Sequence, residues 1–438
     1  MSSGALIYSH SITPRLQYMA DFLSDYYGLE FSLTCSEEVY RNSEVKCKIN
    51  YSYHRIVPGE IWIHSHVLLF ETKERPVKTE CFLLNGVKVF FKAEGEVGFD
   101  ILAAIFYLIT RYEEYLPHKK DEYGRYSHEN SLAFRENFLH KPLVNSWLEI
   151  FRKLLLEKDP AFANRRKFSF LPTYDIDMAW SYKNKGAWRN FASFFRNFFL
   201  GKWKEMNTRI KVLGNKMPDP FDAYEWLDRV HKQYKLDPVY FFLVAERLGR
   251  YDRNISIKNP DFVSLIKNIA SKYKIGLHPS WASAEFPSVI AKEKLWLEEN
   301  SAREVHLSRQ HYIKFELPET YRRLLATGIN QEYSMGYGTV NGFRAGISTS
   351  YKWYDLQTET ATSMLIHPFC FMDANAYYEQ KLTAAEAGNE MRQYLEAIKK
   401  VNGNMITIWH NSFLGTDPAF AGWREEYENF LKVAAKTG

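Results

Sequence analysis

Apolar and polar positions in the first third of the chain follow the spacing expected of an α/β unit. Apolar residues after Pro14 recur on one helical face, which predicts an amphipathic helix, whereas the run from Phe99 to Thr110 is apolar all round, which predicts a buried helix. A further helix is expected near 144–157. Short apolar runs predict strands at 5–8, 61–63, 67–70 and 87–91.

The pattern of apolar and polar residues changes at the polar, basic stretch Asn164-Arg-Arg-Lys. We interpret it as the boundary between one domain of residues 1–165 and another of residues 166–438. Beyond it, short strands that end in polar residues alternate with longer helical stretches, which predicts a parallel sheet with crossover helices, long enough for a barrel. The expected strands are 169–175, 238–243, 274–278, 305–308, 331–334, 342–344, 363–366 and 405–409.

Composition narrows the class of protein. The 438 residues are 46% hydrophobic and 25% charged, which excludes a largely disordered or low-complexity chain. None of the four cysteines has C-x-x-C spacing, so neither a zinc ribbon nor a thioredoxin-type site is expected. Few thiols and a start without a basic, apolar leader predict a cytoplasmic protein.

Basic residues concentrate in one segment, 180–216, which holds nine Lys and Arg against one acid and is rich in Trp and Phe. One interpretation is a helical hairpin that packs its aromatic residues on the barrel. The other is a surface for peripheral membrane contact, through an anionic lipid or a phosphate-bearing sugar carrier. Since a nucleic-acid binder is usually basic over a whole face, no nucleic-acid partner is expected.

Two aspartates close the first strand of the second domain. In Thr173-Tyr-Asp-Ile-Asp, an extended chain places Asp175 and Asp177 on the same face. Two neighbouring carboxylates repel each other unless they share a proton or bind a cation. A metal ion with one aspartate as ligand and the other as base would resolve this, although a plain turn after a strand could also use such a pair.

Other strands end in residues that could join the aspartates. His278, His311 and His410 each stand at or near a strand end, and Arg344 lies between glycines, where it could approach a carboxylate. Each could instead be structural, as a hydrogen-bonded strand end or a turn. Together, however, carboxylates, histidines and an arginine at successive strand ends are typical of a metal-dependent hydrolase. The glycines of Ser334-Met-Gly-Tyr-Gly lack dinucleotide-binding spacing, so no nucleotide cofactor is expected.

The order of these motifs resembles the polysaccharide deacetylase family (the NodB-homology domain, carbohydrate esterase family 4). Thr173-Tyr-Asp-Ile-Asp stands in place of that family's T-F-D-D-G, and His278 in place of its strand-end His. Gly342-Phe-Arg-Ala-Gly approximates R-x-P-Y-G, and Ile408-Trp-His matches L-x-H. The resemblance is closest to an uncharacterised bacterial branch with an extra N-terminal α/β domain. It implies a distorted (β/α)7-type barrel over 166–438.

The resemblance also implies a mechanism. Asp177, His278 and His311 would bind a divalent metal, for which zinc suits the ligands best. Asp175 would act as base, supported by Arg344, and His410 would protonate the leaving amine. The substrate would be an N- or O-acetylated sugar, such as a carrier-linked glycan precursor.

Two departures from the family pattern bear on that mechanism. The family's second metal-binding His falls at Ala282 here, so His311 is the best substitute, with His306 and His367 weaker ones. The Tyr of R-x-P-Y-G is missing as well. Two alternatives therefore stay open: a catalytically inactive barrel that binds carbohydrate, and a glycoside hydrolase that uses two carboxylates. The oligomeric state, the sugar and the role of the N-terminal domain do not follow from the sequence.

Overall fold

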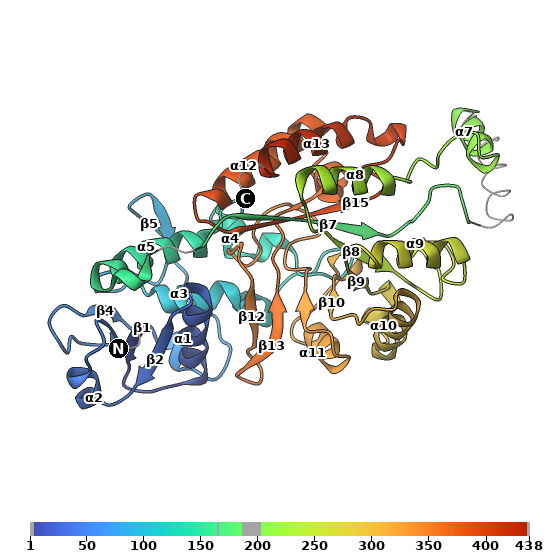
Figure 1. Cartoon of the computed structure of the whole chain (residues 1–438). Helices are drawn as coiled ribbons and strands as arrows, with labels where there is room; N and C mark the ends of the chain where they lie inside the picture. The colour runs from blue at the N-terminus through green and yellow to red at the C-terminus, as the bar shows by residue number, and fades with distance from the viewer. Residues whose placement is uncertain (1–3, 164–165, 186–202, 436–438) are drawn as a thin grey trace.

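A computed structural model describes residues 4–163, 166–185 and 203–435. The described residues form a parallel four-stranded sheet, a mainly parallel nine-stranded sheet and a small two-stranded hairpin, with helices packed on the two larger sheets. The smaller sheet lies toward the N-terminal end and the larger sheet fills the rest of the molecule (Figure 1). This confirms the mixed α/β architecture.

The smaller sheet has the strand order β2-β1-β3-β4, and all its pairings are parallel. Its strands are β1 (Gly4–Tyr8), β2 (Glu30–Thr34), β3 (Cys47–Ser52) and β4 (Ile61–His64). The associated helices are α1 (Pro14–Tyr27), α2 (Glu37–Asn42), α3 (Ile101–Ile109), α4 (Leu132–Arg135) and α5 (Leu143–Lys158), and a short hairpin joins β5 (Phe82–Leu84) to β6 (Val87–Val89).

Local signals explain where the first helices begin. Thr13 caps α1 by accepting a hydrogen bond from the Leu16 amide, and the fixed backbone angle of Pro14 suits the first turn. Asp100 caps α3 through the Ala103 amide at 2.9 Å. Every residue of α3 is buried, as its apolar sequence predicts. The strand expected at 67–70 is wrong, because His66 accepts from the Leu68 amide and starts a short 3-10 helix there.

Within the described residues, the larger sheet has nine strands in the order β12-β13-β11-β10-β9-β8-β7-β15-β14, and only β12 with β13 is antiparallel. Its strands are β7 (Ser169–Ile176), β8 (Val239–Leu243), β9 (Lys274–His278), β10 (Leu307–Ser308), β11 (Gln331–Glu332), β12 (Tyr351–Asp355), β13 (Thr360–Ile366), β14 (Phe371–Met372) and β15 (Asn404–His410). Its helices are α7 (Trp203–Leu213), α8 (Tyr224–Tyr234), α9 (Pro260–Ala270), α10 (Pro287–Ser301), α11 (Glu319–Ala326), α12 (Ala384–Lys399) and α13 (Trp423–Ala434).

The strand pairing differs from the expected barrel in two respects. Among the described residues no ladder joins the edge strands β12 and β14, so closure of the sheet into a barrel stays a prediction. The strand expected at 342–344 is wrong, because this stretch forms a turn in which the Gly346 amide donates to the Phe343 carbonyl.

The two sheets share one continuous hydrophobic core. Buried polar contacts also join them: Arg15 of α1 pairs with Glu359, and the Tyr18 hydroxyl donates to the Lys352 carbonyl at 2.7 Å. The division into two domains at residue 165 therefore stays a prediction, and residues 164 and 165 lie outside the described part.

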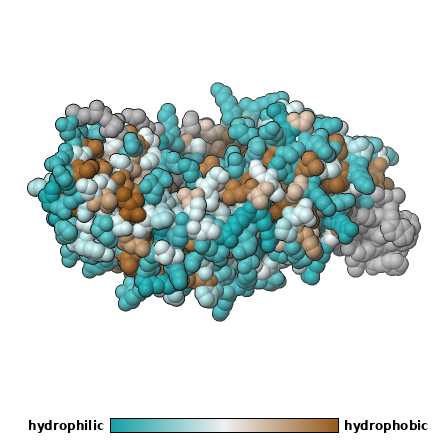
Figure 2. All heavy atoms as spheres, turned by 90° about the horizontal axis from the view of Figure 1, so that it is seen from below, coloured by the Kyte–Doolittle hydropathy of each residue, from teal (hydrophilic) through white to brown (hydrophobic). Residues whose placement is uncertain are grey.

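The surface seen in Figure 2 is mostly hydrophilic, with hydrophobic residues in small separate patches. In the described part of the chain, no helix has the length and apolar character needed to span a membrane.

Candidate metal centre and active site

Five side chains from four strand ends meet in one pocket of about 480 Å³ at the carboxyl edge of the larger sheet. The register of the strands brings these side chains together. Asp175 of β7 lies opposite His410 of β15, and Leu243 of β8 lies opposite His278 of β9. Asp177 and His311 follow directly after β7 and β10. The structure thus brings together five of the six residues selected from the sequence, and Arg344 is the exception.

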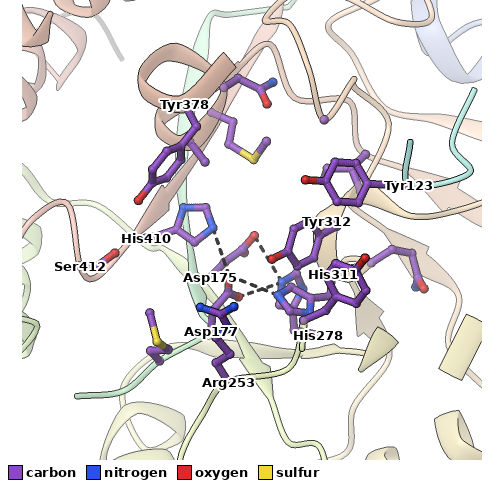
Figure 3. Close-up of a pocket in the computed structure, with 18 of the residues that line it drawn as sticks. Tyr123, Asp175, Asp177, Arg253, His278, His311, Tyr312, Tyr378, His410 and Ser412 are labelled. Carbon is purple, nitrogen blue, oxygen red and sulfur yellow. Dashed lines mark ion pairs between the residues drawn. The ribbon is translucent and has the colours of Figure 1, made fainter. Parts of the chain in front are cut away.

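Asp177 lies at the centre of this group, as Figure 3 shows. Its Oδ1 is 3.1 Å from Nε2 of His278, and its Oδ2 is 3.4 Å from Nε2 of His311. The ligand atoms of these three residues all lie within 4.8 Å of one another, a spacing that one metal ion could bridge. His410 approaches the same carboxylate from the other side, with Nε2 at 3.5 Å from Oδ2.

In each of the three imidazoles, the contact made by Nδ1 fixes the orientation of the ring. Nδ1 of His278 lies 2.5 Å from the Arg309 carbonyl oxygen, which can only accept, so this nitrogen carries the proton. Nδ1 of His311 faces Oδ1 of Asp252 at 3.0 Å, and Nδ1 of His410 faces Oδ1 of Asp373 at 2.6 Å. Each Nε2 is therefore directed toward Asp177, in the arrangement that metal-binding histidines usually show.

This geometry leaves lone pairs facing lone pairs unless a positive charge lies between them. Neutral His278 and His311 would present their Nε2 lone pairs to the Asp177 carboxylate, and Asp177 Oδ1 is buried without a hydrogen-bond partner. Protonation is one remedy: burial lowers the pKa of His311, but the Asp177 and Asp252 carboxylates outweigh burial and raise it to about 9. A divalent cation is the other. Two imidazoles, one carboxylate and room beside them fit zinc with an open coordination position.

The charge on Asp177 responds to the same neighbours. Burial alone would raise the pKa of its carboxyl group, but the nearby His311, His278 and His410 imidazoles hold this pKa well below its usual range. Asp177 therefore stays ionised and available as a ligand.

Asp175 pairs with a different arginine from the one expected. Nη1 of Arg309 lies 2.7 Å from Asp175 Oδ1, and both side chains are at most 2% exposed. The expected pairing with Arg344 is wrong, because Arg344 binds Glu114 with Nη2 to Oε2 at 2.6 Å and Nε to Oε1 at 2.8 Å. Glu114 reaches Arg344 from the N-terminal third of the chain, so that arginine joins the two parts of the molecule.

His410 stands on the opposite side of Asp177 from His311 (Figure 3). Asp373 accepts from its backbone amide at 2.7 Å as well as from its ring. Burial lowers the pKa of His410, but the buried Asp373 carboxylate outweighs it and raises the pKa to about 10. His410 thus carries a proton at neutral pH, as a proton donor must.

The residues that pair with the selected side chains were not selected from the sequence, and Asp252 and Glu114 illustrate why. Asp252, which orients His311, lies in a polar loop where no strand end marks it. Glu114 lies in the Arg-Tyr-Glu-Glu-Tyr stretch, and nothing in that stretch indicates that its partner is Arg344, 230 residues away. The weaker substitutes for the third ligand do not line the pocket: His306 contacts Glu304, and His367 contacts Ser350 and Gln331.

The basic segment 180–216 is only partly described, since residues 186–202 lie outside the described part. Residues 203–213 form α7, next to the undescribed stretch in Figure 1. Both interpretations of this segment stay predictions, as does the cytoplasmic location.

Comparison with known proteins assigns no activity. Residues 5–160 match a family model described as a family of unknown function (DUF7033). No curated protein matches. Solved structures with some similarity include polysaccharide deacetylases. A Mycobacterium smegmatis protein assigned to that group shows 12% identity and a TM-score of 0.40, over 62% of this chain and 85% of that one.

Two further solved structures are more distant. The polysaccharide deacetylase from Bacillus cereus shows 12% identity and a TM-score of 0.32, over 61% of this chain and 88% of that one. A pseudoenzyme of the same esterase family from Bacillus anthracis shows 9% identity and a TM-score of 0.29, over 63% of this chain and 62% of that one. Function has to be argued from the site itself.

Proposed function

We propose that this protein is a metal-dependent hydrolase that removes an N- or O-acetyl group from a sugar or glycan precursor. The observation that carries the proposal is the convergence of three oriented imidazoles on Asp177, with a second, ion-paired aspartate beside it. Such a set of ligands, base and acid in one pocket is what metal-assisted acyl hydrolysis requires.

Asp177, His278 and His311 would hold a divalent ion, for which zinc suits the ligands. When bound, the ion would polarise the acetyl carbonyl and make a water molecule more acidic. Asp175 takes the proton of the attacking water, and the Arg309 guanidinium at 2.7 Å holds the Asp175 carboxylate in place. His410, held by Asp373, gives a proton to the departing nitrogen or oxygen. The products are acetate and the deacetylated sugar.

The pocket and the motifs both support the proposed substrate class. A volume of about 480 Å³ lies in the range of ordinary small-molecule sites. Tyrosines and polar side chains line it, and sugars bind through such mixed surfaces because a pyranose ring has apolar faces and polar edges. A carrier-linked sugar in the cytoplasm is the setting we propose for the reaction.

The decisive experiment measures zinc content and acetate release on the same preparations. Wild-type protein is expected to bind one zinc ion and to release acetate from an acetylated sugar. Asp175→Asn should keep the zinc and lose turnover, whereas His278→Ala and His311→Ala should lose the zinc. His306→Ala is the matched control and should behave as wild type, because His306 lies outside the pocket.

The alternative of an inactive carbohydrate-binding barrel was motivated by the absence of a histidine at position 282. His311 supplies an imidazole beside His278, with ring centroids 4.9 Å apart, so that motive is weakened. Bound zinc without acetate release from any substrate, together with saturable sugar binding, would favour the binding protein over the hydrolase.

A further inference from the structure

Three tyrosines form a continuous aromatic wall on one side of the pocket, and we call Tyr123, Tyr251 and Tyr312 the tyrosine wall. The ring of Tyr123 lies 5.5 Å from that of Tyr312 and 6.2 Å from that of Tyr251, and Tyr251 stacks on Trp281 at 4.0 Å. Tyr123 and Tyr312 lie across the pocket from Tyr378 and His410 (Figure 3). The wall thus adjoins the metal cluster without belonging to it.

Tyr312 combines a strained backbone conformation with an exposed position at the edge of the pocket. Its φ is 58° and that of Ile313 is 54°, a left-handed conformation that is rare for bulky or β-branched residues and costs on the order of 1–3 kcal/mol each. Tyr312 is also 37% exposed. Strain of this kind at the edge of a pocket, directly after the candidate ligand His311, suggests that the ring is positioned for a ligand.

The strained turn is braced from the N-terminal third of the chain. Nη1 of Arg125 donates to the Tyr312 carbonyl at 2.6 Å, and the guanidinium lies 4.7 Å from the centre of the Tyr123 ring. Asp121 fixes Arg125 in turn, with Oδ2 at 2.6 Å from Nε. One buried arginine therefore connects the two tyrosines that come from distant parts of the sequence.

Gly338 provides the space for this arginine. A Cβ atom at position 338 would lie 2.0 Å from Arg125 Nη1 and 3.0 Å from the Tyr312 carbonyl oxygen. Because the first of these atoms is the far end of a long side chain, an alanine at 338 would displace the guanidinium rather than the fold.

We propose that the tyrosine wall binds a second sugar ring, next to the acetylated one, and that Arg125 is a positioning residue that holds the wall in place. The inference rests on the proposed deacetylase function and specifies its substrate as a glycan of at least two units. Aromatic rings match the apolar faces of a pyranose and phenol hydroxyls match its polar edges. The segment matched only by a family of unknown function thereby contributes to substrate recognition.

The first test compares an acetylated monosaccharide with a longer glycan. The zinc-loaded full chain is assayed on N-acetylglucosamine and on its β-linked dimer and tetramer. Wild type is expected to prefer the oligomers at least tenfold in kcat/KM. Tyr123→Ala should reduce that preference about tenfold, mainly through KM, while zinc content stays unchanged. Tyr123→Phe, which keeps the ring, should retain most of the preference.

The second test addresses Arg125 without removing a buried charge. Gly338→Ala should lower the oligomer preference as Tyr123→Ala does, and the double variant should lose little more, because both changes disable one wall. Gly249→Ala is the matched control, since a Cβ there meets nothing within 4 Å. A Gly338→Ala protein with altered zinc content or a much lower melting temperature would count against a positioning role.

The outcomes separate this inference from the proposed function. If wild type releases acetate but Tyr123→Ala keeps the full oligomer preference, or lowers turnover of every substrate alike, the tyrosine wall is not a sugar subsite. If wild type releases no acetate at all, the proposed function fails. The wall then still predicts that the tetramer binds the zinc-loaded protein in a calorimetric titration and that Tyr123→Ala weakens this binding about tenfold.

Discussion

Replacing Asp252 by asparagine would test whether the orientation of His311 matters for metal binding. Oδ1 of Asp252 accepts the proton on His311 Nδ1, and its two oxygens also accept from the Trp281 amide at 3.0 and 3.1 Å. Asparagine has the same shape but only one acceptor oxygen. The variant therefore places an NH2 group where Oδ2 lies 3.1 Å from the Trp281 amide nitrogen, and it removes the negative charge that faces His311 Nδ1.

The size of the effect follows from the role assigned to Asp252. Partners that hold a metal-binding histidine typically account for a 10- to 100-fold change in metal affinity. This corresponds to about 1.4–2.7 kcal/mol of binding free energy. The ligand atoms themselves are unchanged, so we expect weakened zinc binding with the stoichiometry of one retained at high zinc concentration.

Competition with a chromophoric chelator would measure the zinc dissociation constant of each variant. Glu304→Gln is the matched control, because Glu304 pairs with His306 at 3.2 Å on the surface, away from the pocket. Equal zinc affinity in Asp252→Asn and wild type would refute the orientation argument. An equal loss in Glu304→Gln would show that the assay reports a general charge effect.

Three further predictions concern other parts of the structure. Asp373→Asn should lower turnover while leaving zinc content unchanged, because Asp373 holds His410 and raises its pKa; steady-state kinetics with metal analysis would check this. Removing zinc with a chelator should lower the melting temperature of wild type but not of His311→Ala, since only the intact site gains stability from the ion. Burial raises the pKa of Asp100 to about 6, so the folded state binds a proton more readily and stability should fall as pH rises from about 4 to about 6. Melting temperatures of Asp100→Asn should lack this component.

The strand ends that build the site could be predicted because their pattern is local. Each of Asp175, His278 and His410 ends an apolar run, and parallel strands bring their carboxyl ends to one edge. The expected strand at 274–278 agrees with β9 to the residue, and those at 169–175 and 405–409 agree with β7 and β15 to within one residue at each end.

The partners of these residues could not be predicted, because they depend on reach across the fold. Arg309 directly follows β10, and its pairing with Asp175 spans three strand positions of the sheet, from β10 to β7. Asp252 precedes α9 in an irregular loop, so no periodicity selects it. The short strand β14 and the antiparallel β12 escaped prediction because their pairings are made in the tertiary structure.

The displaced third ligand shows why sequence spacing and site geometry can disagree. Strands β9 and β10 are neighbours, with Leu277 opposite Ser308. The residue after Leu277 is His278, and the turn after Ser308 brings His311 beside it, so an imidazole reaches the same region from the next strand instead of from position 282. Because a metal ion requires only ligand atoms in the right positions, the absence of a histidine from one motif does not exclude a metal site here.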